Sequence, residues 1–268
     1  MLRSIAANAL RARRSVAIRT FAAAGGSQVD ALASANPNLD VVRYEHKNIT
    51  WTTRHVQYYS ESLAIGFLEM GFTAGDVVLS WMPQHFSEQM VLQFACSKSG
   101  LVLYTLDPLV AKKDPSKAQQ ALKAALELTK ANILITPEAT NDVNYVNLVH
   151  NVIPELRIFD TSTGEPFVTP RFPHLRLAVH TGFDQDDKYG WFPLRHMVVP
   201  SQNLDSFVTT PPTDQTPLAG VLKVQDDIPV KVEPVLTNAQ VLEKNIWPTY
   251  CSILQKKFHT VEGVGVIF

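Results

Sequence analysis

The stretch from Ile49 to Pro108 constrains the fold more than any other part of this chain, because it alternates strand and helix signals with a turn at nearly every junction. Thr52 or Thr53 is suited to cap the first helix, since its hydroxyl accepts a hydrogen bond from a free backbone N–H group. Gly71 ends this helix, because glycine adopts the left-handed conformation at low cost. The apolar positions of this helix recur at helical spacing and are Val56, Tyr59, Leu63 and Phe67.

The second half of this stretch predicts two buried strands joined by a helix. Residues 77–82 (VVLSWM) form a mostly apolar run that Pro83 closes. A helix follows from about Phe86 to Ser99, and Gly100 separates it from a strand over Leu101–Leu106. Parallel strands joined in this way need helices on both faces of their sheet. The sequence therefore predicts an α/β fold with a parallel or mixed sheet and helices on both faces.

The rest of the chain continues this alternation and then changes texture. Asp114 and Pro115 are predicted to cap and begin a helix, followed by a strand over 132–136, a helix over 142–151 and a short strand over 156–159. From Ser201 onward, frequent prolines leave room only for short strands and turns. A helix is expected around residues 241–245, Pro248 kinks or restarts it, and residues 261–268 are expected to form a last strand.

Residues 1–29 have the composition of a mitochondrial transit peptide. They hold five arginines, and no acidic residue precedes Asp30. The run Arg19-Thr20-Phe21-Ala22, followed by Ala-Ala-Gly-Gly, is a candidate processing site. We therefore predict a mitochondrial protein on the matrix side of the inner membrane, with a chloroplast address as the main competing interpretation. A basic arm for nucleic acid is disfavoured, because no aromatic residues or glycines interleave with the arginines.

Composition excludes several other classes of protein. An apolar content of 46% and a charged content of 18% are those of a globular protein, and no stretch is apolar for long enough to predict a transmembrane segment. Without the five leader arginines the chain has 19 basic and 25 acidic residues, which disfavours nucleic-acid binding. The cysteines, Cys96 and Cys251, indicate a reducing compartment, and Cys96 is interpreted as an apolar core residue.

The stretch resembles the opening domain of AMP-forming acyl-CoA synthetases, which belong to the adenylate-forming ligase superfamily. The resemblance is carried by the Thr-Trp-Thr entry at 50–52, by LAIGFLEMGFTAGDVV at 63–78 and by ACSKSGLVLYTLDP at 95–108. It extends over residues 41–200 and, in outline, over 201–268. It implies a transit-like segment over residues 1–29, an acyl-CoA-synthetase-like α/β domain over 30–200, and a truncated, Pro-rich end of the same domain over 201–268.

The chemistry of this family depends on a Ser/Thr/Gly-rich phosphate loop ending in Pro-Lys-Gly, followed by a Leu-Thr-His helix start. This sequence has Leu236-Thr237-Asn238, with Asn238 where histidine is expected. The preceding window, residues 218–234, keeps one glycine, Gly220, and contains no serine or threonine. Asp226 and Asp227 would repel phosphate, and Lys231 stands among strand-forming valines. The resemblance therefore implies a degenerate relative without a phosphate loop.

The end of the chain and its other motifs add no catalytic machinery. Phe268 comes before the family's adenine-binding segment, ribose-binding acid, hinge and mobile domain with its catalytic lysine. His174 and His180, near Asp184, Asp186 and Asp187, are interpreted as a polar surface loop and not a metal cluster. No GxSxG or GxGxxG motif is present, and the four tryptophans are interpreted as core anchors. We therefore predict no catalytic, cofactor-binding or metal-binding residues, no cofactor, and no enzyme activity.

Three functional hypotheses remain open. The first is a non-catalytic accessory subunit of a mitochondrial inner-membrane respiratory-chain complex, with complex I ranked first and ATP synthase second. Its partners would be other protein subunits and not nucleic acid, with peripheral association to a membrane complex. The alternative is a regulatory module that binds acyl-CoA or a nucleotide, with Lys112, Lys113 and Arg171 as candidate phosphate contacts. The third is an enzyme or a fragment of an AMP-forming acyl-CoA synthetase.

Overall fold

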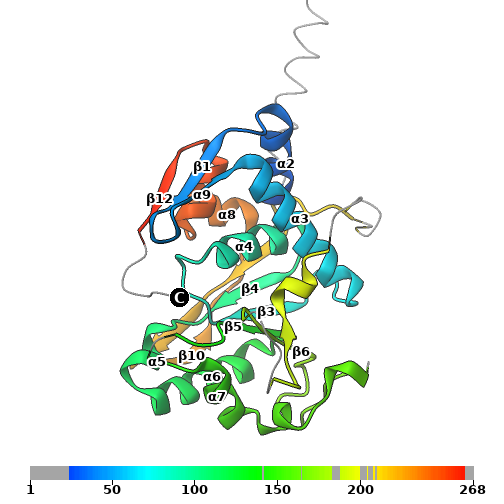
Figure 1. The fold of residues 1–268 in the computed structure, drawn as a ribbon, viewed down its shortest axis with the longest axis vertical. Coiled ribbons are helices and arrows are strands. Elements are labelled where there is room, and N and C mark those ends of the chain that lie inside the picture. Colours follow the sequence, from blue (N-terminus) through cyan, green and yellow to red (C-terminus); the bar gives the residue numbers. More distant parts are fainter. Residues whose placement is uncertain are drawn as a thin grey trace, which may run out of the picture.

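The computed structural model describes residues 24–140, 142–163, 165–182, 188–199, 204, 208 and 210–262 (Figure 1). The α-helices are α2 (Gly25–Ala35), α3 (Thr53–Glu69), α4 (Ser87–Ser99), α5 (Leu109–Lys113), α6 (Pro115–Thr129), α7 (Tyr145–Val152), α8 (Asn238–Glu243) and α9 (Pro248–Leu254). Short 3₁₀ helices are η1 (Glu45–Lys47), η2 (Pro154–Arg157), η3 (Thr161–Thr163) and η4 (Leu194–Met197).

The strands of this part of the chain are β1 (Asp40–Tyr44), β2 (Ile49–Thr52), β3 (Val77–Ser80), β4 (Val102–Thr105), β5 (Ile133–Thr136), β6 (Leu177–His180), β7 (Phe192–Pro193), β8 (Pro217–Gly220), β9 (Leu222–Gln225), β10 (Ile228–Val232), β11 (Leu236–Thr237) and β12 (His259–Val261). The large sheet has the order β11-β8-β4-β3-β5-β6-β7. Its pairs are parallel except β11 with β8, and Val78 of β3 lies between Leu103 of β4 and Ile133 of β5.

Helices cover both faces of the large sheet, as the sequence predicts. One buried cluster joins one face of the strands to α3, α4 and α9, and it includes Val78, Leu103 and Phe67. The other cluster joins the opposite face to α6 and α7, and it includes Leu79 and Leu134. Figure 1 shows the two helical layers on either side of the sheet. Alternate residues of one strand enter different clusters because successive side chains point to opposite faces.

The predicted helix starts are confirmed at two of the positions where sequence signals are strongest. Thr52 is the N-cap of α3, and its backbone N–H group donates to Nδ1 of His55 at 3.1 Å. Asp114 caps α6 and accepts hydrogen bonds from the backbone N–H groups of Ser116 and Lys117 at 2.9 and 3.1 Å. Gly100 ends α4 in the left-handed conformation, with φ of 75°.

Two local predictions need correction, one for Tyr59 and one for residues 156–159. Tyr59 is 39% exposed, because Ser60 takes the inward position between Val56 and Leu63 on α3. The strand expected over 156–159 is wrong, since Pro154 begins the 3₁₀ helix η2 there. The boundary between residues 29 and 30 falls inside α2, where Val29 is fully buried. The remaining leader residues, 1–23, lie outside the described residues, as do 263–268 of the expected last strand.

A second, smaller sheet brings together segments from the two ends of the described chain. Its order is β12-β1-β2, with β1 parallel to β12 and antiparallel to β2. Val42 of β1 pairs with His259 of β12, and Figure 1 shows these strands beside α9. This sheet places β2 next to α3, on the helical layer that also holds α4.

Candidate functional site

The topological switch point of the large sheet lies between β3 and β5. The loop after β3 runs to α4 on one face, whereas the loop after β5 runs to α7 on the other face. In open α/β sheets ligands bind outside the carboxyl ends of the strands at such a point, because the diverging loops leave a crevice. The fold therefore favours a site near the carboxyl ends of β3, β5 and β6.

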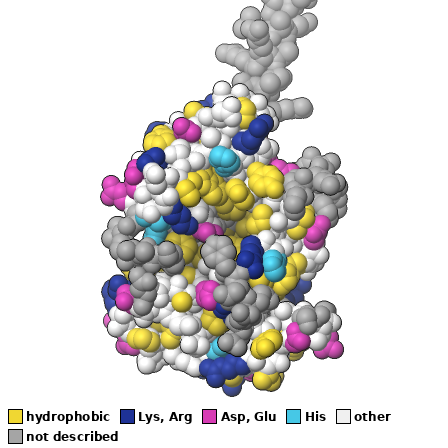
Figure 2. All heavy atoms as spheres, in the orientation of Figure 1, with side chains coloured by type: hydrophobic (Ala, Val, Ile, Leu, Met, Phe, Trp, Pro, Cys, Tyr) yellow, Lys and Arg dark blue, Asp and Glu magenta, His cyan; other side chains and the backbone are white. Residues whose placement is uncertain are grey.

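A pocket of about 300 Å³ opens at this edge, on the face that carries α3 and α4. We call it the edge pocket. Its walls come from β2, α3, the first turns of α4, the segment after β6, and η4 with the residue that follows it. Figure 2 shows hydrophobic side chains gathered in a hollow on this side of the molecule, with Lys, Arg and His side chains around it. The apolar lining residues are Trp51, Tyr59, Leu63, Val91, Leu194 and Val198, and the polar ones are Ser87, Glu88, Thr181, Gly182 and Arg195.

Local sequence explains why these walls meet. Tyr59 and Leu63 stand one turn apart on α3, so they share one side of that helix. Gly66 lies one turn further along, where a Cβ atom would be 1.9 Å from the backbone oxygen of Met197. Only glycine allows η4 to approach α3 this closely, and this contact fixes the wall that carries Leu194.

The two charged residues that line the edge pocket, Glu88 and Arg195, differ in their ion pairing within the described ranges. Glu88 accepts a hydrogen bond from Oγ of Ser87 at 2.9 Å and pairs with Lys47 at 3.7 Å. Arg195, by contrast, is exposed and has no ion pair with any residue in the described ranges. The mouth of the pocket therefore suits a group with negative charge beside an apolar body.

The position where the family resemblance places the phosphate loop is occupied by a β-hairpin. Strands β9 and β10 pair antiparallel between β8 and β11, and Ile228 lies opposite Gln225. The two turn residues, Asp226 and Asp227, both have positive φ angles, 51° and 65°. This is the backbone that a two-residue hairpin turn requires, and aspartate tolerates it. Residues 218–234 therefore contribute to strands β8, β9 and β10 and to the turns between them.

This hairpin is docked against the helical layer of α6. Asp227 pairs with Lys117 in the first turn of α6 at 3.5 Å, and Pro229 is buried. Lys231 is the candidate counterpart of the family's phosphate-loop lysine. It is exposed on β10 and lies opposite Lys223 of β9. Part of the backbone N–H groups pair the two strands, and an extended strand pair does not form the concave array of N–H groups that binds phosphate.

Asn238, which stands where the family has histidine, is a buried structural residue. Its Oδ1 accepts hydrogen bonds from Oγ of Ser97 at 2.7 Å and from the backbone N–H group of Gly25 at 3.3 Å. Its Nδ2 donates to the backbone oxygen of Thr216 at 3.0 Å. The Leu-Thr-Asn helix start predicted from sequence is confirmed, because Thr237 caps α8 in a capping box with Gln240. Asn238 thus ties α8 to α4 and α2.

The three candidate phosphate contacts do not form one site. Lys112 on α5 pairs with Asp142 at 2.7 Å, near the carboxyl ends of the strands. Arg171 pairs with Glu155 at 3.3 Å, beyond the last residue of α7. Because α7 runs antiparallel to the strands, Arg171 lies near their amino ends, whereas Lys112 lies near their carboxyl ends. Lys113 is exposed at the end of α5.

The sequence also singles out a histidine, His180, and a cysteine, Cys96. His180 is buried, and its Nδ1 accepts a hydrogen bond from the backbone N–H group of Gly182 at 3.1 Å. Asp184, Asp186 and Asp187 lie outside the described residues, and within the described ranges no group of three or more His, Cys, Asp or Glu residues is arranged to hold a metal ion. Cys96 is a buried core residue, and burial raises the pKa of its thiol.

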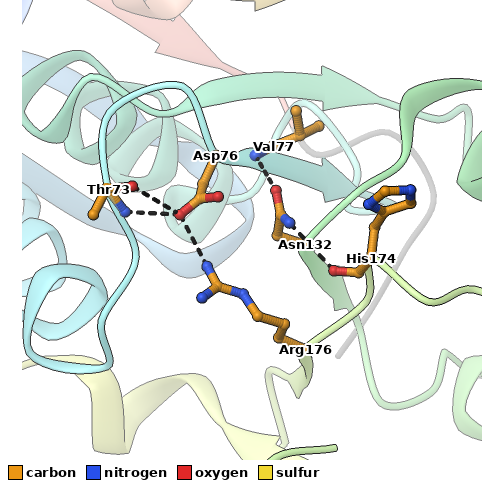
Figure 3. A network of polar contacts seen from close by, with 6 residues as sticks. All are labelled: Thr73, Asp76, Val77, Asn132, His174 and Arg176. Carbon is orange, nitrogen blue, oxygen red and sulfur yellow. Dashed lines mark hydrogen bonds and ion pairs between the residues drawn. The ribbon is translucent and has the colours of Figure 1, made fainter. Parts of the chain in front are cut away.

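A polar network lies at the amino ends of the strands, opposite the end of the sheet that carries the edge pocket (Figure 3). A carboxylate oxygen of Asp76 accepts hydrogen bonds from the backbone N–H group of Thr73 at 2.8 Å and from Nη2 of Arg176 at 2.9 Å. The guanidinium of Arg176 also lies 4.3 Å from the ring centroid of Phe72. Asn132 joins Val77 to the backbone oxygen of His174. These contacts connect the amino ends of β3, β5 and β6, so we interpret the network as structural.

The largely parallel sheet with helices on both faces has the architecture of the first part of acyl-CoA synthetases. The chain belongs to the AMP-binding enzyme family, whose model matches residues 29–169. It is 28% identical over 157 residues to YngI, a Bacillus subtilis (strain 168) protein named as an acyl-CoA synthetase, which covers 59% of this chain and 27% of that protein. It is 22% identical over 161 residues to the mitochondrial medium-chain acyl-CoA ligase ACSF2 of Danio rerio, covering 60% and 25%.

Solved structures show the same fold. Acetoacetyl-CoA synthetase from Streptomyces lividans matches 90% of this chain and 38% of its own with a TM-score of 0.67 at 13% identity. The luciferase-like enzyme from the nonluminescent mealworm Zophobas morio matches 90% and 54% with a TM-score of 0.64 at 10% identity. The chain spans about a quarter of the length of the curated relatives it matches. None of the helices in the described residues is both long and apolar enough to cross a membrane.

Sequence reasoning missed the edge pocket. It placed Tyr59 on the apolar stripe of a helix and treated Trp51 as a structural anchor, and Arg195 carried no motif. The available signal was the cluster of aromatic residues Trp51, Tyr58 and Tyr59 around one helix start. That cluster exceeds what a single buried stripe of α3 can accommodate, so part of it has to lie at the surface.

Proposed function

We propose that this chain is a non-adenylating member of its family, an acyl-CoA-synthetase-like module that acts by binding and not by catalysis. The observation that supports this proposal best is the β9–β10 hairpin in the place of the phosphate loop. An adenylating enzyme has to hold the phosphates of ATP beside a carboxylate, and it uses glycines, hydroxyls and lysine to do so. The paired strands supply no glycine and no hydroxyl group, their turn carries two aspartates, and Lys231 is exposed on β10 opposite Lys223.

An ATP–pyrophosphate exchange assay tests this proposal on the full-length protein. Decanoate and acetoacetate are suitable acids, because relatives and structural neighbours are named for medium-chain and acetoacetyl substrates. We expect no exchange above the background of protein-free samples. Exchange that depends on the added acid and is lost in Lys231→Ala would contradict the proposal and make Lys231 the family lysine after all.

An acyl group is the first candidate for what the module binds. The relatives are named as acyl-CoA synthetases or ligases, and the edge pocket offers a largely apolar wall with a cation at its mouth. Calorimetric titration with decanoate, decanoyl-CoA and ATP separates an acyl site from a nucleotide site. Binding of decanoate that Leu194→Trp removes by filling the pocket would support this candidate, and flat titrations for all three ligands would exclude it.

An accessory role in a mitochondrial respiratory-chain complex is the second candidate, with complex I ranked before ATP synthase and the matrix side of the inner membrane as the location. It is supported by the arginine-rich residues 1–29 and by a relative that is named as mitochondrial. Separation of native mitochondrial complexes, followed by mass spectrometry of each fraction, tests it. Migration with a respiratory complex would support this role, and migration as a free monomer would contradict it.

A further inference from the structure

An exposed row of large apolar side chains runs beside the edge pocket. We call it the aromatic strip and define it as Ile49, Trp51, Tyr58 and Tyr59. Ile49 and Trp51 point to the same side of β2, being two residues apart. The rings of Trp51 and Tyr59 are 5.1 Å apart between centroids, and those of Tyr59 and Tyr58 are 5.3 Å apart. The three aromatic rings therefore form a continuous row, and Ile49 extends it on the same side of β2.

The strip exposes more apolar surface than folding requires. Ile49 is 45% exposed, Tyr58 46% and Tyr59 39%. Trp51 is half-buried, since its ring packs edge-on against that of buried Tyr44. Single exposed apolar residues are ordinary, but a contiguous group marks a surface that another molecule covers. Tryptophan and tyrosine are also the residues that contribute most at protein–protein interfaces.

The strip and the edge pocket form one surface. Trp51 and Tyr59 belong to both, whereas Ile49 and Tyr58 lie outside the pocket lining. A small ligand held in about 300 Å³ would leave those two outer side chains in water. A segment of polypeptide can fill the pocket with one side chain and cover the rest of the strip with its neighbours.

The charges on this surface specify the partner further. Arg195 has no ion pair within the described part of the chain, whereas Glu88 is already paired with Lys47. A second copy of this chain is a poor fit, because a twofold interface would place the same basic surface against itself. A segment with an acidic residue beside its apolar anchor fits, since its carboxylate can pair with Arg195.

We propose that the aromatic strip and the edge pocket together bind a segment of a partner protein, which inserts one aromatic or large aliphatic side chain into the pocket and places an adjacent Asp or Glu against Arg195. This inference builds on the proposed non-catalytic role and names the surface that carries it. The two can fail separately, because pyrophosphate exchange tests catalysis and peptide binding tests this surface.

Binding of defined peptides to the full-length protein tests the inference. The probe is a library of 12-residue peptides with a central Trp, Phe or Leu and flanks that are acidic, neutral or basic. We expect saturable binding of the acidic set, measured by fluorescence polarisation, and a loss of about tenfold or more in Tyr59→Ser and in Arg195→Glu. Arg195→Glu should also shift the preference toward peptides with basic flanks, which a general loss of folding cannot produce.

Matched controls come from the same chain. Ile158→Ser and Val168→Ser remove exposed apolar side chains elsewhere, at 87% and 71% exposure, and should leave peptide binding unchanged. Equal binding of acidic and basic peptides, or unchanged binding in Tyr59→Ser, would overturn the inference. Self-association of the protein that Tyr59→Ser abolishes would assign the surface to a second copy. Decanoate binding lost in Leu194→Trp, without any peptide binding, would assign the pocket to a small ligand.

Discussion

Oγ of Ser97 on α4 donates a hydrogen bond to Oδ1 of Asn238 on α8 across 2.7 Å, although the two residues are 141 positions apart in the sequence. The hydroxyl of Tyr250 lies 3.3 Å from the same Oγ, and the backbone N–H group of Gly25 reaches the same Oδ1. One buried amide therefore links three helices and a helix start. In a buried network of this kind, removal of one member leaves the others without partners.

Asn238→Ala should lower the free energy of unfolding by about 1–3 kcal/mol, because Ser97 and the Gly25 N–H group lose their buried partner. Urea unfolding followed by circular dichroism measures the change. Asn147→Ala is the control, since Asn147 is exposed on α7 and its replacement should change stability by less than about 0.5 kcal/mol. Equal losses in the two variants would show that the network does not stabilise the fold.

Gly66→Ala should destabilise the protein even though alanine is the better helix former. The added Cβ atom would stand 1.9 Å from the backbone oxygen of Met197, and backbone cannot move aside as a flexible side chain can. We expect a loss of about 1–3 kcal/mol from this overpacking. Glu69→Ala, at the exposed end of the same helix, is the control. A gain in thermal stability in Gly66→Ala would mean that η4 does not pack on α3 as described.

Stability should fall as the pH is lowered from 7 toward 5. His150 is buried, its Nε2 accepts a hydrogen bond from Nε1 of Trp191 at 2.8 Å, and burial and then Arg157 lower its pKa. A lowered pKa means that the unfolded chain binds the proton first, so the contribution is full above the ordinary histidine value and is lost as the pH falls through it. His85 and His259 act in the same direction, since burial lowers their pKa values too.

Unfolding in urea at pH 5, 6, 7 and 8 measures this dependence. His150→Gln, which retains an acceptor, should flatten the pH dependence without removing it, because the other imidazoles remain. A variant with the same slope as the natural protein would show that His150 contributes nothing to it.

Lys231→Ala should leave the stability within about 0.5 kcal/mol, because the side chain is exposed and faces Lys223 across the hairpin. Removal of one of two like charges placed opposite each other is expected to be neutral or slightly stabilising. Thermal unfolding at low and high salt measures it. Asp227→Asn is the informative companion, since it breaks the pair with Lys117 and should loosen the hairpin on α6. A large loss in Lys231→Ala would point to a partner for that lysine.

The sequence was most informative where local chemistry decides the conformation. Thr52, Asp114 and Gly100 mark helix ends through groups within one turn of themselves, and all three act as predicted. The apolar runs of β3 and β5 likewise predicted buried strands, because parallel strands covered on both faces need no polar residues. The single glycine and the lack of serine and threonine in residues 218–234 were also readable, since they depend only on which residue types are present.

Which side chains are buried, and which distant residues they contact, could not be predicted from the sequence in the same way. Tyr59 fits a helical stripe as well as Ser60 does, and only the packing of α3 on α4 decides which of the two is buried. Asn238 differs from the family histidine in one letter, but its role depends on Ser97 and Gly25, which are remote in the sequence. Likewise, the burial of Val29 could not be predicted from local sequence, because it results from docking of α2 on the rest of the domain.

The sequence by itself determined the fold class, the helix ends and the family, and it showed that residues 218–234 hold one glycine and no serine or threonine. These depend on backbone preferences and on residue types within a few positions of each other. Tertiary structure alone decided that β2, α3, α4 and η4 enclose the edge pocket, that Arg195 lies at its mouth and that Ile49, Trp51, Tyr58 and Tyr59 form one exposed strip. A surface is assembled from segments that no local pattern connects, and for this reason it follows only from the packed chain.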